Sequence, residues 1–416
     1  MQRTTVTALC LALAASGCGA GAVSPIDQSS PPVARSIAAP AASYASFADW
    51  RDDFRRRAVT PGGIRADVFD AAFAGVGVNE EVVRLDGHQA EFTRPIWEYI
   101  DGAASGDRIG TGRTQRASRA ETLAAIESRF GVDRDVVLAI WGMESNFGSF
   151  RGSMPVIGSL ATLAYEGRRR DFAEEELVAA LMILQAGDTT PGNLVGSWAG
   201  AMGHTQFMPT SFLAHAVDFT GDGRRDIWGS DPTDALASAA NYLAQNGWQR
   251  GRPWGLEVRL PAGFDYAVAE QSNRRPVADW RARGVTRIDG SALPDHGPAA
   301  VIVPAGANGP AFVVYENFFV IKRYNNATSY AMGVGHLADR IGGAGPFVQS
   351  WPRGERGLSR GEKVELQERL IARGYDPGST DGVIGPDTQG AIRGFQASQG
   401  MTPDGFATAG LLARLR

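Results

Sequence analysis

Residues 133 to 148 read DRDVVLAIWGMESNFG, and this stretch decides how the first half of the chain is interpreted. Its apolar residues recur at helical spacing, Asp133 stands at the position of an N-cap, and the stretch ends in glycine. Val137, Trp141 and Glu144 are spaced i, i+4 and i+7, so they share one face of the helix. The pattern therefore predicts a buried helix that carries one carboxylate on its apolar side.

Glu144 lies in the last turn of this predicted helix, where the helix dipole presents negative charge. Burial and the dipole both disfavour a carboxylate, so we expect the pKa of Glu144 to be raised. Cleavage of a glycosidic bond requires an acid that keeps its proton near neutral pH. The alternative is a glutamate that caps the helix end or forms a salt bridge and has no part in chemistry. Spacing alone does not decide between the two.

A second informative stretch, residues 196 to 212, reads GSWAGAMGHTQFMPTSF. Its five Gly and Ala residues allow backbones to approach closely. Ser197, His204, Gln206 and Thr210 supply neutral hydrogen-bonding groups. A groove for a neutral, hydroxyl-rich polymer such as a sugar favours amides, hydroxyls and aromatics over dense charge. The alternative is a tight helix contact whose polar groups are satisfied internally.

Helical patterns fill most of the chain from about residue 47 to residue 250. Ser118 to Glu121 reads SRAE, the pattern of a capping box, and predicts that a helix starts there. From residue 255 to residue 322, short apolar runs such as AAVIVPAG and AFVVYENFFVIKRY predict strands and turns. Helix returns at SYAMGVGHLADRI. We therefore expect a mainly α chain of the α+β class with a small β-containing subdomain.

The last 60 residues predict a separate unit of three short helices, preceded by the linker sequence GGAGPFVQSWPRGERG. Asp-Gly pairs at 381–382 and 404–405 set its turns. A unit of this size has a limited core and little room for an active site, so we expect a binding module. Its predicted core residues are Leu366, Leu370, Ile392, Phe395 and Leu411.

The chain has 416 residues, of which 44% are hydrophobic and 21% are charged, as in a soluble globular protein of two or three domains. Its net charge of −4 gives no global basic field, so we expect no nucleic-acid partner. The only cysteines are Cys10 and Cys18. The rest of the chain therefore offers no disulfide, thiol nucleophile or cysteine metal site.

Residues 1 to 18 are typical of a secretory signal peptide. Arg3 precedes Val6 to Ala15, an apolar run too short to span a bilayer. The sequence ASGC that ends at Cys18 resembles a bacterial lipobox, with alanine in place of the usual leucine. We expect lipidation at Cys18, and ordinary cleavage and export is the alternative. Residues 19 to 44 are rich in Ala, Ser and Pro and predict a flexible linker.

Five motifs closely resemble the lytic murein transglycosylases of the membrane-bound B type: WGMESNFG, GSWAGAMGHTQFMPTSF, AVDFTGDGRRDIW, ALASAANYLAQNGW and RYNNATSYAMGVGHLAD. They occur in the family's order, and the last 60 residues resemble the three-helix peptidoglycan-binding module of many wall enzymes. The resemblance implies a lysozyme-like helical catalytic core within a catalytic domain at 45–345. A linker at 346–357 and a peptidoglycan-binding domain at 358–416 would follow.

The resemblance also implies a chemistry. In that family the glutamate of the WG(M/V)ES-type motif is the sole catalytic acid and base, so Glu144 takes that role. It would protonate the glycosidic oxygen between N-acetylmuramic acid and N-acetylglucosamine. It would then deprotonate the C6 hydroxyl of the muramic acid, which closes onto C1 as a 1,6-anhydro ring. The substrate's own acetamido group stabilises the intermediate, so no second carboxylate and no cofactor are required, unlike the usual pair of acids.

By the same resemblance, polar and aromatic residues bind the sugars on two sides of the acid. The first side is formed by Ser197, Gln206 and Phe207. The other side is closed by Tyr324, Asn325 and Tyr330.

Residues 218 to 226 read DFTGDGRRD, which matches the first half of an EF-hand-like calcium loop. Position 12 is glycine rather than glutamate, and the resemblance offers Asp234 as the last carboxylate. Calcium here would be structural. The alternative is an Asx-rich turn held by side chain-to-backbone hydrogen bonds without metal. The candidate ligands are Asp218, Thr220, Asp222, Arg224 through its carbonyl, and Asp234.

The sequence thus favours a periplasmic lipoprotein of a Gram-negative bacterium that cleaves peptidoglycan strands without water. Glycine after Cys18 favours the outer membrane, and only the lipid anchor would touch it. Cell-wall synthesis complexes are further expected partners. A muramidase that hydrolyses the same bond and a non-catalytic wall-binding scaffold are the alternatives. The C-terminal module would raise the effective concentration of the enzyme at the wall, or act as a regulatory or protein-docking module.

Overall fold

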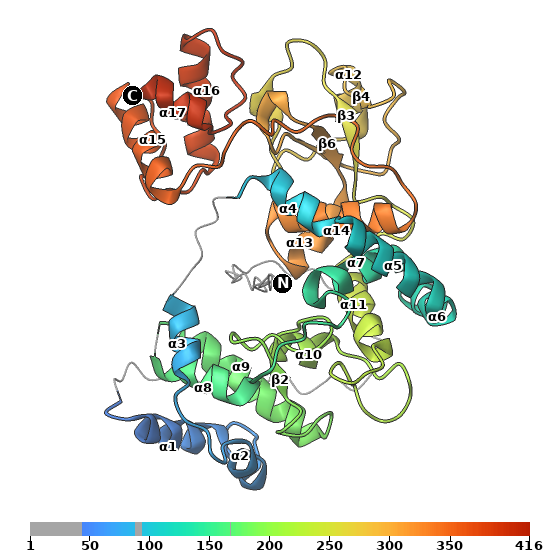
Figure 1. The fold of residues 1–416 in the computed structure, drawn as a ribbon, viewed down its shortest axis with the longest axis vertical. Helices are drawn as coiled ribbons and strands as arrows, with labels where there is room; N and C mark the ends of the chain where they lie inside the picture. Colours follow the sequence, from blue (N-terminus) through green and yellow to red (C-terminus); the bar gives the residue numbers. More distant parts are fainter. Residues whose placement is uncertain (1–43, 88–93, 167) are drawn as a thin grey trace, which may run out of the picture. The chain divides into compact units, whose positions relative to one another are not determined.

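The computed structural model describes three stretches of the chain, residues 44–87, 94–166 and 168–416. The predicted signal peptide, Cys18 and, apart from Tyr44, the predicted N-terminal linker lie outside them. The backbone contacts divide the molecule into two compact units, and Figure 1 labels most of their helices and strands. No helix in these stretches is both long enough and apolar enough to cross a membrane.

The first unit, residues 44–87 and 111–245 of the described chain, is almost entirely helical, with one two-stranded antiparallel pair. α5 (Gly106–Ser118) crosses the boundary between the units. The other elements of the first unit are α1 (Phe47–Ala58), α2 (Ala66–Ala72), α3 (Glu80–Gly87), α6 (Ala120–Phe130), α7 (Arg134–Ser145), β1 (Met154–Pro155), α8 (Val156–Glu166), α9 (Arg170–Ala186), β2 (Val195–Gly196), α10 (Pro209–His215) and α11 (Thr233–Gln245).

α7 to α9 form the centre of this unit. Every residue of α7 from Val136 to Gly142 is buried, and α8 packs along α9. A helix that is apolar on all sides belongs inside a fold. In α9, the fully buried Glu174 accepts a hydrogen bond from Trp50 Nε1 at 2.9 Å and pairs with Arg57 at 2.7 Å. This buried ion pair attaches α1 to the core.

The second unit, residues 94–110 and 246–416 of the described chain, contains a four-stranded antiparallel sheet with strand order β4-β3-β6-β5. Trp280 packs in its core and donates a hydrogen bond from Nε1 to the carbonyl of Ala299 at 2.8 Å. Its elements are α4 (Ile96–Ala103), β3 (Gly255–Arg259), η1 (Tyr266–Val268), α12 (Val277–Ala282), β4 (Thr286–Arg287), β5 (Ala300–Ile302), η2 (Gly306–Asn308), β6 (Ala311–Val314), α13 (Glu316–Tyr324), α14 (Thr328–Ile341), α15 (Arg360–Ala372), α16 (Pro386–Ser398) and α17 (Ala409–Leu415).

The predicted fold class is confirmed: the chain is mainly α, with small antiparallel sheets and a C-terminal helical module. Two local predictions are wrong. AFVVYENFFVIKRY is a strand only as far as Val314, because Phe318 and Ile321 are buried at helical spacing in α13. The predicted capping box at Ser118 does not exist, since α5 continues through Ser118 and its hydroxyl donates back to the carbonyl of Gln115.

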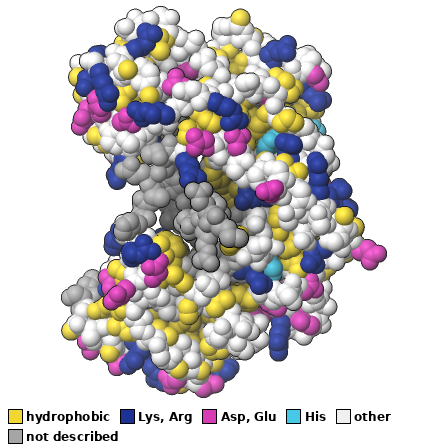
Figure 2. All heavy atoms as spheres, viewed as in Figure 1, with side chains coloured by type: hydrophobic (Ala, Val, Ile, Leu, Met, Phe, Trp, Pro, Cys, Tyr) yellow, Lys and Arg dark blue, Asp and Glu magenta, His cyan; other side chains and the backbone are white. Residues whose placement is uncertain are grey.

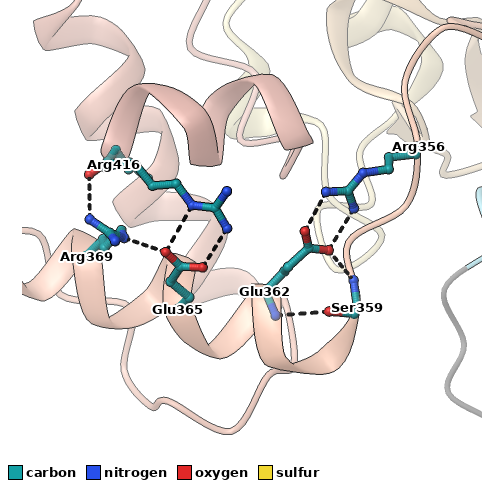
Figure 3. A network of polar contacts seen from close by, with 7 residues as sticks. Arg356, Ser359, Glu362, Glu365, Arg369 and Arg416 are labelled. Atoms are coloured by element: carbon teal, nitrogen blue, oxygen red, sulfur yellow. Dashed lines mark hydrogen bonds and ion pairs between the residues drawn. The ribbon is translucent and has the colours of Figure 1, made fainter.

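The C-terminal module does contain a capping box, at the start of α15. Ser359 accepts from the backbone N–H of Glu362 at 3.2 Å, and the Glu362 carboxylate accepts from the Ser359 N–H at 2.9 Å. Figure 3 shows how Arg356 clamps Glu362 while Arg369 and Arg416 converge on Glu365. Figure 2 shows acidic and basic side chains side by side over this module. These pairs join the end of the predicted linker and the C-terminal residue of the module to α15.

The interior of the module follows the prediction. Leu366, Leu370, Ile392, Phe395 and Leu411 are all buried in one cluster. The two Asp-Gly turns are built alike, because in each the glycine N–H donates to the side-chain oxygen of a buried glutamine. These bonds are Gly382 to Gln367 and Gly405 to Gln396, each at 2.9 Å. The two Asp-Gly turns thus share the same hydrogen bond from glycine to a buried glutamine.

Candidate active site

Glu144 stands in the last turn of α7 and is half-buried. Its neighbours Trp141, Ser145 and Phe147 are buried. The helix that was predicted from residue 133 begins after Asp133, which occupies the N-cap position without a side-chain cap bond. The carboxyl group therefore sits at the end of a rigid, buried helix.

The turn that follows α7 has an unusual backbone. Asn146, Phe147 and Gly148 have φ values of 48°, 56° and 82°, all in the left-handed region. Asn tolerates this region, whereas most other residues with a side chain, such as Phe147, avoid it at a cost of about 1–2 kcal/mol. The strain persists where the surroundings over-determine the conformation, and such positions cluster at functional sites. Here the Phe147 ring lies over Gly142, where an added Cβ would come within 2.7 Å of it.

The second motif holds this turn through His204. Trp141 Nε1 donates to His204 Nδ1 at 3.0 Å, and Ser145 Oγ donates to the His204 carbonyl at 2.7 Å. Gly148 lies so close to the imidazole that an added Cβ would be 2.5 Å from its Cε1. The stretches WGMESNFG and GHTQF are thus one hydrogen-bonded structure.

The imidazole of His204 is held neutral in one tautomer. Burial lowers its pKa, and its Nδ1 must accept from Trp141, so the proton is on Nε2. Nε2 then donates to the carbonyl of Gly229 at 2.8 Å. Arg151 donates to the carbonyls of Trp228 and Gly229, at 2.6 Å each. This arrangement suits a framework role better than proton transfer.

Ser197 and Gln206 lie in the same unit as Glu144. Ser197 Oγ accepts from the N–H groups of Ala199 and Ala201, at 3.3 Å and 3.0 Å, which leaves its own proton to be donated. Gln206 has a left-handed backbone, with φ of 50°. Its Nε2 donates to two carbonyls, of Arg151 at 3.1 Å and of Gly203 at 2.8 Å. Both amide hydrogens are used internally, so the amide oxygen is the group left to accept from a ligand.

The predicted aromatic residues occupy two different environments. Phe207 is buried and its ring centre is 5.9 Å from that of Tyr242. Tyr324 and Tyr330 belong to the second unit, with nearly parallel rings 6.4 Å apart. Asn325 ends α13 and accepts a hydrogen bond from the Ala327 N–H at 3.1 Å. The sugar-binding roles of these residues stay predictions.

The candidate calcium loop brings its three carboxylates together. Oxygens of Asp218, Asp222 and Asp234 lie within 4.8 Å of one another. Burial acts to raise the pKa of Asp218, but hydrogen bonds from backbone N–H groups of the loop outweigh it and the pKa is lowered. The almost fully buried Asp234 accepts from the N–H groups of Phe219 and Thr220. The loop therefore satisfies the Asx-turn alternative and also presents a set of oxygens suited to a hard cation.

Sequence reasoning missed buried acids in this unit, among them Glu176. Glu176 is buried and accepts hydrogen bonds from the N–H and the hydroxyl of Thr210, at 2.9 Å and 2.7 Å. It lies in the run Glu174 to Glu176, which on its own resembles a solvated helix face. The signal that was available is that Ala173, Glu176 and Ala180 share a helix face with apolar residues.

Comparison with known proteins agrees with this geometry. A family model described as a transglycosylase SLT domain matches residues 46–339. The chain belongs to this SLT transglycosylase family. A second family model, of a peptidoglycan binding domain, matches residues 359–415. The predicted resemblance is thereby confirmed.

The chain matches individual proteins of this kind with different sequence identity and coverage. The chain is 33% identical over 225 residues to membrane-bound lytic murein transglycosylase B of Escherichia coli; the match covers 51% of this chain and 58% of that relative. SltB3 of Pseudomonas aeruginosa, solved with NAG-anhNAM-pentapeptide, is 52% identical, with a TM-score of 0.86 over 90% of this chain and 100% of that chain. Escherichia coli Slt35, solved in complex with calcium, is 28% identical, with a TM-score of 0.62 over 70% of this chain and 92% of its own.

Proposed function

We propose that the chain is a lytic transglycosylase that cleaves the β-1,4 bond between N-acetylmuramic acid and N-acetylglucosamine of peptidoglycan and leaves 1,6-anhydro ends. The observation that carries the proposal is Glu144, held at the end of a buried helix by a strained turn and by the second motif. The relative SltB3 binds a fragment with an anhydro sugar. An anhydro ring forms when a sugar hydroxyl, and not water, displaces the leaving group.

In the proposed reaction Glu144 acts twice. It first donates its proton to the glycosidic oxygen, and the bond from that oxygen to C1 breaks. The C6 hydroxyl of the muramic acid then attacks C1, and its proton passes to the Glu144 carboxylate, which restores the starting state. Gln206 would accept a hydrogen bond from the substrate through its amide oxygen, and Ser197 would donate one. Phe207 would bind sugar in the same unit, and Tyr324, Asn325 and Tyr330 of the second unit are also proposed to bind sugars.

The test is digestion of purified sacculi by the wild type and by Glu144→Gln, with the products identified by mass spectrometry. We expect anhydro-muropeptides from the wild type and about 10²–10⁴-fold less product from the variant, the usual range for loss of a general acid or base. Glu121→Gln, an exposed glutamate of α6, is the matched control and should keep full activity. Reducing ends would favour a muramidase, and unchanged cleavage by Glu144→Gln would remove the catalytic role and leave the binding scaffold.

We also propose that the loop at Asp218 binds calcium as a structural ion through Asp218, Thr220, Asp222, Arg224 and Asp234. The close carboxylates and the calcium complex of Slt35 support this. Calcium should raise the melting temperature of the wild type, and EGTA should reverse the effect. Magnesium should do less, since it demands a tighter octahedral geometry. Equal melting curves with calcium and with EGTA would leave the metal-free turn.

The chain is further proposed to work in the periplasm as a lipoprotein of the outer membrane, anchored through Cys18. The ASGC sequence supports lipidation, and the family's substrate supports a location at the wall. Labelling of cells with an alkyne fatty acid should tag the wild type and leave Cys18→Ala untagged. An untagged wild type that is still exported would indicate ordinary cleavage.

The domain organisation is proposed to be a catalytic domain at 45–345 and a peptidoglycan-binding domain at 358–416. The ranges of the two family models, 46–339 and 359–415, support these boundaries. Peptidoglycan strands are the proposed partner of both domains, and wall-synthesis complexes are proposed as further partners.

A further inference from the structure

The predicted linker before the C-terminal module is packed on the sheet of the second unit. The backbone N–H groups of Val348 and Gln349 donate to the two carboxylate oxygens of Glu257 in β3, at 2.7 Å each. The Phe347 ring stacks on that of His336, with centres 3.9 Å apart. These contacts fix the predicted linker within the second unit.

The module itself also contacts the sheet subdomain. Asp404 Oδ2 accepts from the backbone N–H of Ala307 at 2.8 Å. Gly306 approaches so closely that an added Cβ would be 2.5 Å from the same oxygen, and its φ of +68° also favours glycine. Arg393 of α16 pairs with Glu270 at 3.4 Å, and both side chains are more than two-thirds buried. The module and the subdomain are therefore joined by specific contacts.

A pocket of about 630 Å³ lies at this junction, and we call it the junction pocket. The sheet subdomain and the start of α4 form one part of its wall, and the module forms the rest. Its volume falls in the usual range for sites that bind small molecules and short peptides. The residues used in the argument below are Arg94, Glu270, Val303, Lys363, Ile384 and Phe406.

The charges that line the junction pocket are unbalanced. Lys363 is half-buried, and in the described parts of the chain its ammonium group has no ion-pair partner. Arg94, an exposed residue that lines the same pocket, has none there either. The carboxylate of Glu270 is already paired with Arg393. A partly desolvated cation without a partner is unfavourable, and a bound carboxylate would offset that cost.

We propose that the junction pocket binds the peptide of peptidoglycan, with a peptide carboxylate at Lys363 and Arg94. The inference rests on the proposed function, which makes peptidoglycan the substrate. A peptide fits better than a glycan strand, because two cations and small apolar side chains such as Val303 and Ile384 suit carboxylates and methyl groups. Of the aromatic residues, only Phe406 lines the pocket within the described chain, whereas sugars favour several stacking rings.

The test uses the full chain and a sugar-free synthetic pentapeptide with the stem sequence of peptidoglycan, with affinity measured by calorimetry. We expect Lys363→Glu to weaken binding at least tenfold and Lys363→Gln to weaken it less. Arg414→Glu is the matched control, since it makes the same charge change on an exposed residue of α17 outside the pocket. A pentapeptide with its carboxylates amidated should bind the wild type more weakly, and melting curves should confirm that each variant is folded.

Two results would overturn the proposal: no binding of the pentapeptide to the wild type, or equal affinity for folded Lys363→Glu and Arg414→Glu. The outcome is separate from that of the proposed function. A wild type that releases anhydro-muropeptides from sacculi and ignores the pentapeptide would refute the junction site alone. A wild type that binds the pentapeptide in a Lys363-dependent manner and leaves sacculi uncut would refute the catalytic proposal alone.

Discussion

The surroundings of Glu176 predict how the free energy of unfolding of the protein depends on pH. Its side chain is buried in α9 and contacts the first turn of α10 through two hydrogen bonds from Thr210. Burial raises the pKa of Glu176 from the ordinary value of 4.5 to about 7, although the bonds from Thr210 act in the opposite direction. The carboxyl group therefore keeps its proton in the folded state at pH values where the unfolded chain loses it.

The sign of the effect follows from proton linkage. Below pH 4.5 both states hold the proton, so Glu176 leaves the free energy of unfolding unchanged. Between pH 4.5 and about 7 only the folded state holds it, so stability falls as the pH rises. Above about pH 7 the loss is complete, and it amounts to about 3 kcal/mol at 1.36 kcal/mol per pH unit.

The perturbation is Glu176→Gln, which keeps the shape and cannot ionise. Urea unfolding of the wild type and the variant, followed by circular dichroism from pH 4 to pH 8, gives the difference in free energy of unfolding. We expect this difference to move in favour of the variant by about 3 kcal/mol across that range. Glu121→Gln should keep a constant difference, because Glu121 is exposed. A constant difference for Glu176→Gln as well would refute the reasoning.

Three further substitutions probe the frame around the candidate active site. Gly148→Ala should lower the stability by at least about 1 kcal/mol and should also lower sacculus cleavage, because φ is +82° and the added Cβ would meet the His204 ring. The control is Gly158→Ala in α8, which has open space around it and should be neutral or stabilising in the same melting and digestion assays. Trp141→Phe leaves His204 Nδ1 without its donor and should cost about 1–3 kcal/mol in urea unfolding. Glu174→Ala leaves the buried Trp50 Nε1 without its acceptor and Arg57 with Asp53 as its remaining ion-pair partner. It should cost about 1–3 kcal/mol, against little for Glu175→Ala on the exposed side of α9.

The elements that sequence predicted well are those whose signal is local and periodic. α7 and the module's core follow from apolar spacing alone, since burial of one face decides both. The two Asp-Gly turns follow from the chemistry of the dipeptide. α13 was mistaken for a strand because its apolar residues FFVI are consecutive, and only Glu316 before them and Lys322 after them hint at helix ends.

Other features depend on partners that are distant in the sequence. Glu174 and Glu176 are buried although the run of acids resembles a surface, because Arg57 and Thr210 approach them from 117 and 34 residues away. The junction pocket likewise needs the module and the sheet subdomain together, so no local pattern could predict it. Local propensity and periodicity carry no information about contacts between residues so far apart in the sequence.

The strained turn after Glu144 combines a feature that local sequence predicts with one that depends on distant partners. The sequence places a glutamate at a helix end, and Asn146 is a residue type that favours the left-handed conformation there, but nothing in Phe147 predicts a left-handed backbone. The bonds of Trp141 and Ser145 to His204 supply the energy that holds the turn, and they come from a segment about 60 residues further along the chain. An acid that must donate and then recover a proton at one sugar needs a fixed position more than it needs a second carboxylate. The two motifs are therefore best understood as one rigid support for a single proposed catalytic group.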